Sequence, residues 1–212
     1  MKKFIISLCC LFLFKNFLLS NDNSIVGDYW VGFGYQHYSN DLVEQNSFNI
    51  SSNFPVLKNI DLNVGGSIGQ ISTPIADLGA YGLDFGTTFH NEFETQDGIL
   101  KSIDPFFGIN LGLHYIEQSA FFYSGGFLYY TYSYETLVPL SFHTGSEFKF
   151  GDFFLIRPFL RYITILNEDI DDAFQFGVAA DFLISEYFSI GLGISGNDDG
   201  GVYYGLGLRY HM

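Results

Sequence analysis

The sequence is poor in cysteine, in positive charge and in long apolar runs. Its two cysteines, Cys9 and Cys10, lie close to the N-terminus, so neither disulfides nor thiol chemistry is expected to hold the remaining chain together. Nine Lys and Arg stand against 23 Asp and Glu, and the net charge of −14 argues against nucleic acid as a partner. After residue 20, no apolar run approaches the roughly 18 residues that a membrane helix requires.

The first 20 residues have the pattern of a secretory signal peptide. Lys2 and Lys3 precede an unbroken apolar run over residues 4–14, which is too short to span a bilayer. We therefore expect residues 1–20 to be a cleaved signal peptide and residues 21–212 to form one exported domain. The alternative is a lipoprotein acylated at one of the two cysteines, although neither follows the small residue that such sites prefer.

Aromatic residues and glycine are abundant. Aromatics make up 19% of the chain and charged residues only 15%, and glycine occurs 24 times. Such a chain is too aromatic for an ordinary water-exposed surface, yet it lacks membrane helices. A closed barrel is the remaining architecture that pairs every backbone N–H and C=O inside hydrocarbon. The composition therefore predicts an all-β fold, a transmembrane antiparallel up-and-down β-barrel in the outer membrane.

Alternation of apolar with polar or small residues supports this fold, because it is the pattern of strands that face lipid on one side and the lumen on the other. Ten segments show it: 28–38, 44–54, 60–68, 81–90, 107–115, 140–150, 154–162, 174–184, 189–194 and 202–211. Ten is an even number, as single-chain bacterial barrels require. Eight strands is the alternative, if the second or the ninth segment does not span the membrane.

The hairpin turns predict the register and the orientation. A turn at Gly125-Gly126 pairs lipid-facing residues with one another, and a turn over residues 151–153 places Glu147 opposite Arg157. With an even strand number, both termini and the short turns lie in the periplasm. Five longer segments then lie outside the cell: 39–43, 71–77, 118–137, 166–172 and 195–201.

The segment 118–137 keeps alternating beyond the length that a membrane strand needs. One interpretation is a β-ribbon that projects from the cell surface. The other is that its tyrosines belong only to the aromatic girdle at the outer membrane interface. The tyrosines concerned are Tyr129, Tyr130, Tyr132 and Tyr134.

Charged residues on the inward face are the main candidates for a functional site. The acids are Asp61, Asp84, Glu147 and Asp181, and the bases are Lys149, Arg157, Arg161 and Arg209. They form either a structural network that satisfies charges inside the lumen or the lining of a narrow pore. We expect Glu147 and Arg157 to form an ion pair.

The C-terminal stretch resembles the last strand of small outer-membrane barrels of the OmpA-like and opacity-like families. Leu206, Leu208, Tyr210 and Met212 hold its alternating positions, with Met in place of the usual terminal Phe. The resemblance implies that Leu208, Tyr210 and Met212 form a signal read by the barrel-assembly machinery.

The sequence His37-Tyr38-Ser39-Asn40 resembles the His-x-Ser-Asn motif of lipid A deacylases, which carry it near the C-terminus of their barrels. The resemblance implies that His37 is a base, Ser39 a nucleophile and Glu44 the acid that orients the histidine. An esterase on the lipid-facing surface is therefore the enzymatic alternative.

Two acidic segments, 167–172 and 197–199, either bind divalent cations that bridge to lipopolysaccharide or are simply solvated. The other histidines lack metal-ligand spacing, and no phosphate-binding glycine loop is present, so we expect no metal or cofactor. The leading hypothesis is a non-enzymatic outer-membrane barrel, either a structural or adhesin-like surface protein or a narrow pore for small solutes. Its expected partners are outer-membrane lipid, lipopolysaccharide, the assembly machinery and an extracellular ligand.

Overall fold

The computed structural model describes residues 26–40, 43–74, 76–96, 98–124, 127–168, 172–198 and 200–212. For residues 118–124 and 127–132 it describes the backbone alone. The expected signal peptide and its cysteines lie outside the described residues. Within those residues, no helix is long and apolar enough to cross a membrane.

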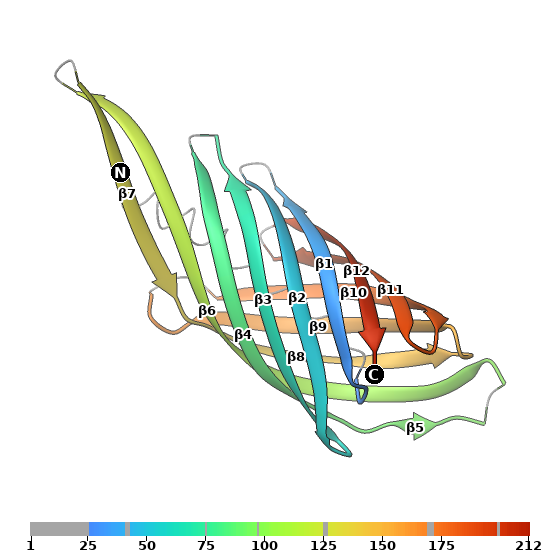
Figure 1. The fold of residues 1–212 in the computed structure, drawn as a ribbon. Helices are drawn as coiled ribbons and strands as arrows, with labels where there is room; N and C mark the ends of the chain where they lie inside the picture. Colours follow the sequence, from blue (N-terminus) through green and yellow to red (C-terminus); the bar gives the residue numbers. More distant parts are fainter. Residues whose placement is uncertain are drawn as a thin grey trace.

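The described residues form twelve strands (Figure 1). They are β1 (Trp30–Ser39), β2 (Glu44–Leu57), β3 (Ile60–Ser72), β4 (Asp77–His90), β5 (Phe93–Glu94), β6 (Leu100–Ser124), β7 (Phe127–Leu137), β8 (Pro139–Phe150), β9 (Phe154–Ile165), β10 (Ala173–Ser185), β11 (Phe188–Asn197) and β12 (Val202–His211).

Ten of these strands close into one antiparallel barrel. Their order is β4-β3-β2-β1-β12-β11-β10-β9-β8-β6, and β6 pairs back with β4. β1 pairs with β12 over its whole length, from Trp30 opposite His211 to Ser39 opposite Val202. The expectation of ten strands is confirmed, and the alternative of eight is wrong because β2 and β11 each pair on both sides.

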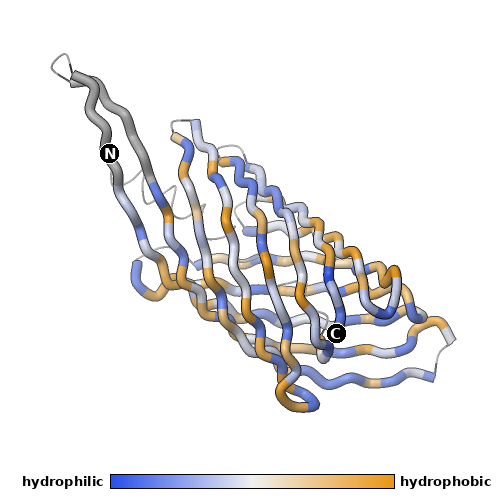
Figure 2. Tube along the Cα trace, viewed as in Figure 1, coloured by the Kyte–Doolittle hydropathy of each residue, from blue (hydrophilic) through white to orange (hydrophobic). Residues whose placement is uncertain are grey.

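The alternation predicted from the sequence matches the two surfaces of the wall. Figure 2 shows hydrophobic and hydrophilic residues alternating along the strands. On β1, Phe33 is exposed on the outside, whereas Trp30 and Gln36 are buried on the inside. On β4, Leu83 and Phe85 are exposed and Asp84 between them is buried. The barrel therefore has an apolar outer surface and a polar interior, the reverse of a water-soluble protein.

Several strands extend further than the sequence predicted. The fifth barrel strand begins at Leu100 instead of residue 107, and the third and eleventh strands of the structure continue to Ser72 and Asn197. The loops shorten accordingly, because backbone pairing continues where the outward side chains are no longer apolar. One example is the pair formed by Ser72 and Asp77 at the end of the β3–β4 hairpin.

The barrel has two distinct ends. We call the end with Tyr29 and Met212 the terminal end; there the Met212 N–H donates to the Tyr29 carbonyl at 2.9 Å. The short turns at residues 58–59, 151–153 and 186–187 lie at this end. Strand β10 continues to Ser185, so the last of these turns has two residues, and Phe182 pairs with Ile190 across this hairpin.

The opposite end, here called the ribbon end, carries the extension of β6 and β7. β4 pairs with β6 only as far as Gln118, whereas β7 pairs with β6 up to Ser124 opposite Phe127. Figure 1 shows this two-stranded ribbon rising beyond the other hairpins. The expected register is confirmed: Tyr123 pairs with Leu128, and the same register continues into β8. The projecting ribbon that the sequence suggested is therefore present in the backbone.

The side chains of Tyr129, Tyr130 and Tyr132 lie outside the described part of the structure. Tyr134 is exposed, and its ring centroid lies 4.9 Å from that of Tyr115. Tyr115 in turn lies 6.4 Å from Tyr81. At the base of the ribbon, then, tyrosines do form part of an aromatic row on the outer surface.

We predict that the close approach of β8 and β9 makes any larger residue at position 145 destabilising. A Cβ added there would overlap the Pro158 carbonyl oxygen and lie 3.1 Å from the Phe159 Cα, both backbone atoms. Gly145→Ala should lower the free energy of unfolding by about 1–3 kcal/mol. Gly66→Ala is the control, because its nearest neighbour would be a Leu83 methyl group at 3.5 Å. Urea titration of the refolded barrel measures both, and equal effects would contradict the close approach.

Candidate functional site

Charged side chains from four strands form a network in the lumen. Asp181 on β10 forms ion pairs with Arg157 on β9 and with Arg209 on β12. The Arg157 Nε also lies 3.4 Å from Glu147 Oε2 on β8. The Arg209 guanidinium stands over the Trp30 ring, 5.3 Å from its centroid. All five side chains are buried, and the two positive charges are matched by two negative charges.

A glycine on the intervening strand makes room for this network. β11 lies between β10 and β12, and its inward position at this level is Gly191. A Cβ there would lie 2.7 Å from Asp181 Oδ1 and 3.0 Å from an Arg209 nitrogen. The ion pair between Asp181 and Arg209 therefore crosses a strand that contributes no side chain.

A second cluster closes around His90 near the terminal end. Its Nδ1 lies 3.0 Å from Asp104 Oδ2, and its Nε2 lies 3.5 Å from Asp61 Oδ1. Asp61 also accepts hydrogen bonds from the Gly27 N–H at 2.7 Å and the Asn53 side chain at 3.0 Å. These contacts join the segment before β1 to the walls formed by β2, β3, β4 and β6.

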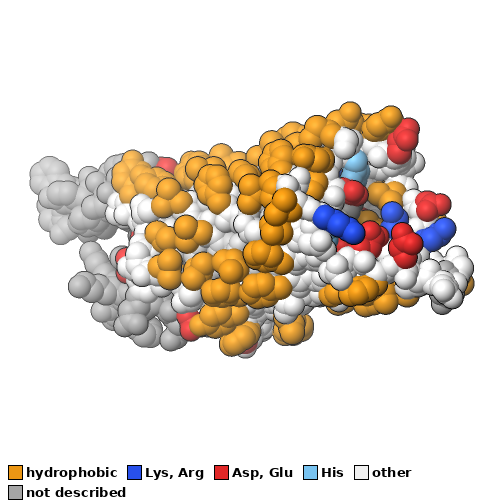
Figure 3. All heavy atoms as spheres, turned by 90° about the horizontal axis from the view of Figure 1, so that it is seen from below, with side chains coloured by type: hydrophobic (Ala, Val, Ile, Leu, Met, Phe, Trp, Pro, Cys, Tyr) orange, Lys and Arg blue, Asp and Glu red, His pale blue; other side chains and the backbone are white. Residues whose placement is uncertain are grey.

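This end of the lumen is open and charged. Figure 3 shows acidic and basic side chains gathered around a hollow at one end of the barrel. The hollow has a volume of about 510 Å³, and its lining includes Lys58, His90, Asp104, Glu147 and Lys149. We call it the vestibule. It is large enough for a small solute.

The middle of the lumen carries a third set of polar contacts. His114 Nε2 lies 3.0 Å from Asp84 Oδ1, and the Asn110 side chain lies 3.4 Å from His143 Nδ1. Arg161 is buried here and stands opposite His143 in the β8–β9 register. Asp84 is thus paired with a histidine.

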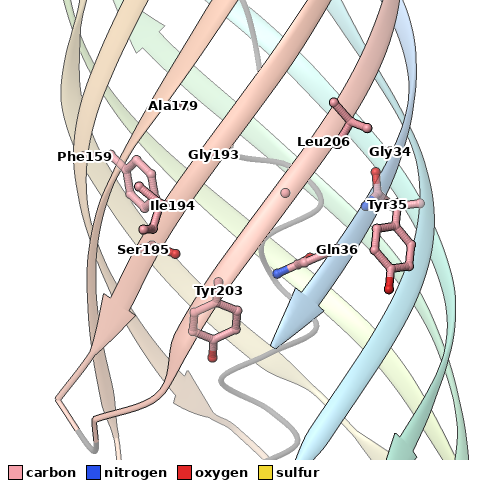
Figure 4. A pocket seen from close by; sticks show the side chains of 12 residues that line it. Gly34, Tyr35, Gln36, Phe159, Ala179, Gly193, Ile194, Ser195, Tyr203 and Leu206 are labelled. Atoms are coloured by element: carbon pink, nitrogen blue, oxygen red, sulfur yellow. The ribbon is translucent and has the colours of Figure 1, made fainter. Parts of the chain in front are cut away.

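The free space near the middle is small. Figure 4 shows Phe159, Ser195, Gln36 and Tyr203 around a cavity whose volume is about 30 Å³. A cavity of this size holds one or two water molecules. This cavity is too small for a solute.

Many inward-facing residues near the ribbon end are apolar, although Gln45 and Asn197 are buried at the same level. The Tyr38 and Tyr203 rings are in contact, with centroids 4.6 Å apart. They belong to a connected set of buried side chains from β1, β3, β4, β6, β7, β9 and β12 and the β1–β2 loop, which we call the apolar belt. Its members are Tyr38, Val43, Ile71, Leu78, Ala80, Ile116, Leu137, Ile165 and Tyr203. The belt separates the charged lumen from the ribbon end.

The sequence placed the charged lumen residues correctly on the inward face but grouped them only in part. The Glu147–Arg157 pair is confirmed, and Asp181 and Arg209 join it. Asp61, Asp84 and Arg161 belong to the other two groups, and Lys149 lines the vestibule. Whether these residues have a role beyond structure stays a prediction.

Sequence reasoning missed His90 and Asp104 as a pair. Asp104 lies at an inward position of β6, in step with Gly108 and Asn110, but before the point at which apolar alternation becomes clear. Extending the inward positions of that strand by four residues would have identified Asp104 as an inward residue, though not as the partner of His90.

Glu44, the acid of the lipid A deacylase hypothesis, is not the partner of His37 in the structure. His37 faces outward, and its Nδ1 lies 3.0 Å from the Asn46 side-chain oxygen. Glu44 stands opposite Ser39 in the β1–β2 register, two pairs further along than His37 and Asn46. The expected contact from Glu44 to His37 is therefore replaced by a neutral one.

The remaining sequence candidates lie on the surface. Leu208, Tyr210 and Met212 are exposed on the outer face of the last strand, and their role in assembly stays a prediction. The acidic segments 167–172 and 197–199 lie partly outside the described residues. In the described part, no group of three His, Cys, Asp or Glu is arranged to hold a metal ion.

No protein-family model matches the chain, and no curated protein does. Solved structures match over nearly its whole length. The translocator domain of the autotransporter NalP from Neisseria meningitidis has a TM-score of 0.54 at 8% identity, with 99% of this chain and 98% of that one covered. An outer-membrane channel from Pseudomonas putida F1 has a TM-score of 0.53 at 8% identity, covering 92% and 98%. The transport unit of the autotransporter AIDA-I from Escherichia coli has a TM-score of 0.50 at 11% identity, covering 96% and 97%.

These likenesses concern the fold, because the sequence identities are low. Together with the ten-strand closure and the apolar outer surface, they assign the chain to the fold of the small bacterial outer-membrane β-barrels. This agrees with the resemblance noted at the last strand.

We predict that Asp181 stabilises the barrel more than any single surface charge. Asp181→Asn leaves Arg157 and Arg209 buried with Glu147 alone to balance them. Breaking a buried ion pair in this way costs about 3–5 kcal/mol of unfolding free energy. Asp152→Asn, in an exposed turn, is the matched control and should change it by less than about 0.5 kcal/mol. A loss at Asp181 no larger than the control's would mean that the network does not hold the wall.

Proposed function

We propose that this chain is a non-enzymatic outer-membrane barrel that presents the β6–β7 ribbon at the cell surface and keeps its lumen closed to ions. The ribbon carries the proposal, because its backbone continues well beyond the last pair that the neighbouring strand β4 makes with β6. A barrel that only anchored itself in lipid would need no strand of 25 residues.

The orientation follows from the lengths of the connections. Bacterial barrels have short turns on the periplasmic side and longer loops outside. The turns at 58–59, 151–153 and 186–187 lie at the terminal end, so that end faces the periplasm and the ribbon faces outward. The exposed apolar band between the two ends contacts outer-membrane lipid and the acyl chains of lipopolysaccharide.

Two features support a closed lumen. Arg157 and Arg209, two of the three lumen arginines, are already paired with Asp181 and Glu147, and the nearby cavity holds only one or two waters. The apolar belt beyond them disfavours hydrated ions in a narrow passage. The alternative is a narrow pore that the vestibule would feed, with the buried charges as its filter.

The enzymatic alternative has less support. His37 hydrogen-bonds the neutral Asn46 and not an acid, and the matched structures are translocator domains and a channel. We therefore infer that ester hydrolysis is not the role of this surface. The assembly machinery that reads the last strand and a ligand bound by the ribbon are the proposed protein partners.

Conductance tests the closed lumen. The refolded wild-type barrel should give no stable steps in planar bilayers, because its charges are internally paired. Arg157→Ala removes the residue that bridges Asp181 and Glu147, and should at most produce brief, irregular events. Stable ion-selective steps in the wild type, altered in the variant, would establish the pore instead.

Surface labelling of whole cells tests the orientation. Ser133 at the ribbon and Asp152 at the terminal end are both exposed. Ser133→Cys should react with a membrane-impermeant maleimide on intact cells, and Asp152→Cys only after the outer membrane is permeabilised. The reverse pattern would place the ribbon in the periplasm and overturn the proposed function.

A further inference from the structure

The outer part of the ribbon has open strand edges. Among the described strands, β7 pairs with β6 alone, so the edge of residues 127–133 that faces away from β6 has no strand beside it. A two-stranded ribbon in water is only marginally stable, and a third strand adds main-chain hydrogen bonds that stabilise it. The ribbon would therefore be stabilised by a third strand at this edge.

The base of the same edge shows what kind of group it accepts. The side-chain amide of Asn167 takes the place of a neighbouring peptide group there. It accepts a hydrogen bond from the Val138 N–H at 2.7 Å and donates one to the Thr136 carbonyl at 2.7 Å. The chain itself therefore fills the beginning of this edge with an amide.

The ribbon sequence lacks the devices that usually protect an exposed edge. Natural edge strands carry lysine, proline or inward charges that prevent pairing with other chains. Residues 119–134 contain no charged residue and no proline, and they are rich in the aromatic residues that favour strands. Nothing in this stretch discourages the addition of a strand.

The charge around the ribbon specifies the partner. Of the nine Lys and Arg, three lie in the first 20 residues, and the other six lie at the terminal end or inside the lumen. The described charged residues at the ribbon end are all acids: Glu44, Asp77, Glu117, Glu135, Glu168, Asp172 and Asp198. A second copy of this chain would bring the same acids to the edge and be repelled. A cationic partner would be attracted.

We propose that the β7 edge of the ribbon binds an extended, lysine- or arginine-rich peptide segment of another protein, which adds a strand beside residues 127–133. Main-chain hydrogen bonds supply the affinity, as in other cases of strand addition. The acidic ribbon end selects the charge. This inference rests on the proposed function, because it requires the ribbon to be outside the membrane.

The probe is a dye-labelled ten-residue peptide of alternating Lys and Val, added to the refolded full-length barrel in phosphatidylcholine vesicles. Fluorescence anisotropy measures its binding. One control peptide has Glu in place of Lys, and a second keeps the Lys residues but is N-methylated at every peptide bond, so that it cannot donate backbone hydrogen bonds.

The matched barrel variant lacks residues 119–124 and 127–132. It keeps the Gly125-Gly126 turn, the Gln118–Ser133 pair and all the acids, because the deletion removes six complete pairs of one register. Heat-dependent gel mobility and circular dichroism establish that it folds.

The Lys–Val peptide should bind the intact barrel at least about tenfold more tightly than the shortened one, and at least about tenfold more tightly than the N-methylated peptide binds. Equal binding of the N-methylated peptide would mean attraction to the acids without strand addition, and would overturn the proposal even if the shortened barrel failed to fold. Absence of binding by the Lys–Val peptide would also overturn the proposal. A barrel that is silent in bilayers and labelled at Ser133→Cys on cells, yet binds no peptide, would overturn this inference and leave the proposed function standing.

Discussion

Every feature of this barrel depends on the requirement that backbone N–H and C=O groups be paired inside hydrocarbon. The pairing of β1 with β12 closes the ring and leaves no free edge within the membrane. The same requirement explains why the outer parts of β6 and β7 differ from the strands of the closed barrel. Beyond Gln118 the β4 neighbour ends, and a strand pair with open edges is tolerable only where water can satisfy it. We therefore interpret β6 as one continuous strand that passes from a closed sheet in lipid to an open ribbon in water.

Closure leaves an interior that must be filled. The wall turns its apolar side chains outward, so polar and charged side chains meet inside, where each needs a partner. The result is a graded lumen. A hydrated, charged vestibule lies at the terminal end, paired charges around Asp181 follow, and the apolar belt lies next to the ribbon end. This order places an apolar barrier between the charges and the ribbon end, which is why we interpret the charges as structural and not as a filter.

The sequence was sufficient for the fold because alternation with a period of two is a direct consequence of strand geometry. It predicted ten strands, the inward charges and the register of the β6–β7 hairpin. Strand ends were less predictable, since Ser72 and Asp77 pair without any apolar signal. Apart from the pair of Glu147 and Arg157, the sequence also did not predict which charged residues pair with one another. Asp181 meets Arg209 only because Gly191 leaves space between them, and His90 meets Asp104 across strands whose stagger the sequence does not specify. Function was least accessible, because acids, histidines and serines on alternating positions fit several roles equally well.

The central claim is that one strand pair lies in two environments. Residue-resolved amide hydrogen exchange of the barrel in lipid bilayers tests it most directly. Amides of β12 between Leu206 and Tyr210, paired on both sides, should stay protected for hours. Alternate amides of residues 127–133, which face the open edge of β7, should exchange within minutes, while those facing β6 exchange more slowly. Uniform protection of both regions would mean that the ribbon is embedded or already paired, and would contradict the account.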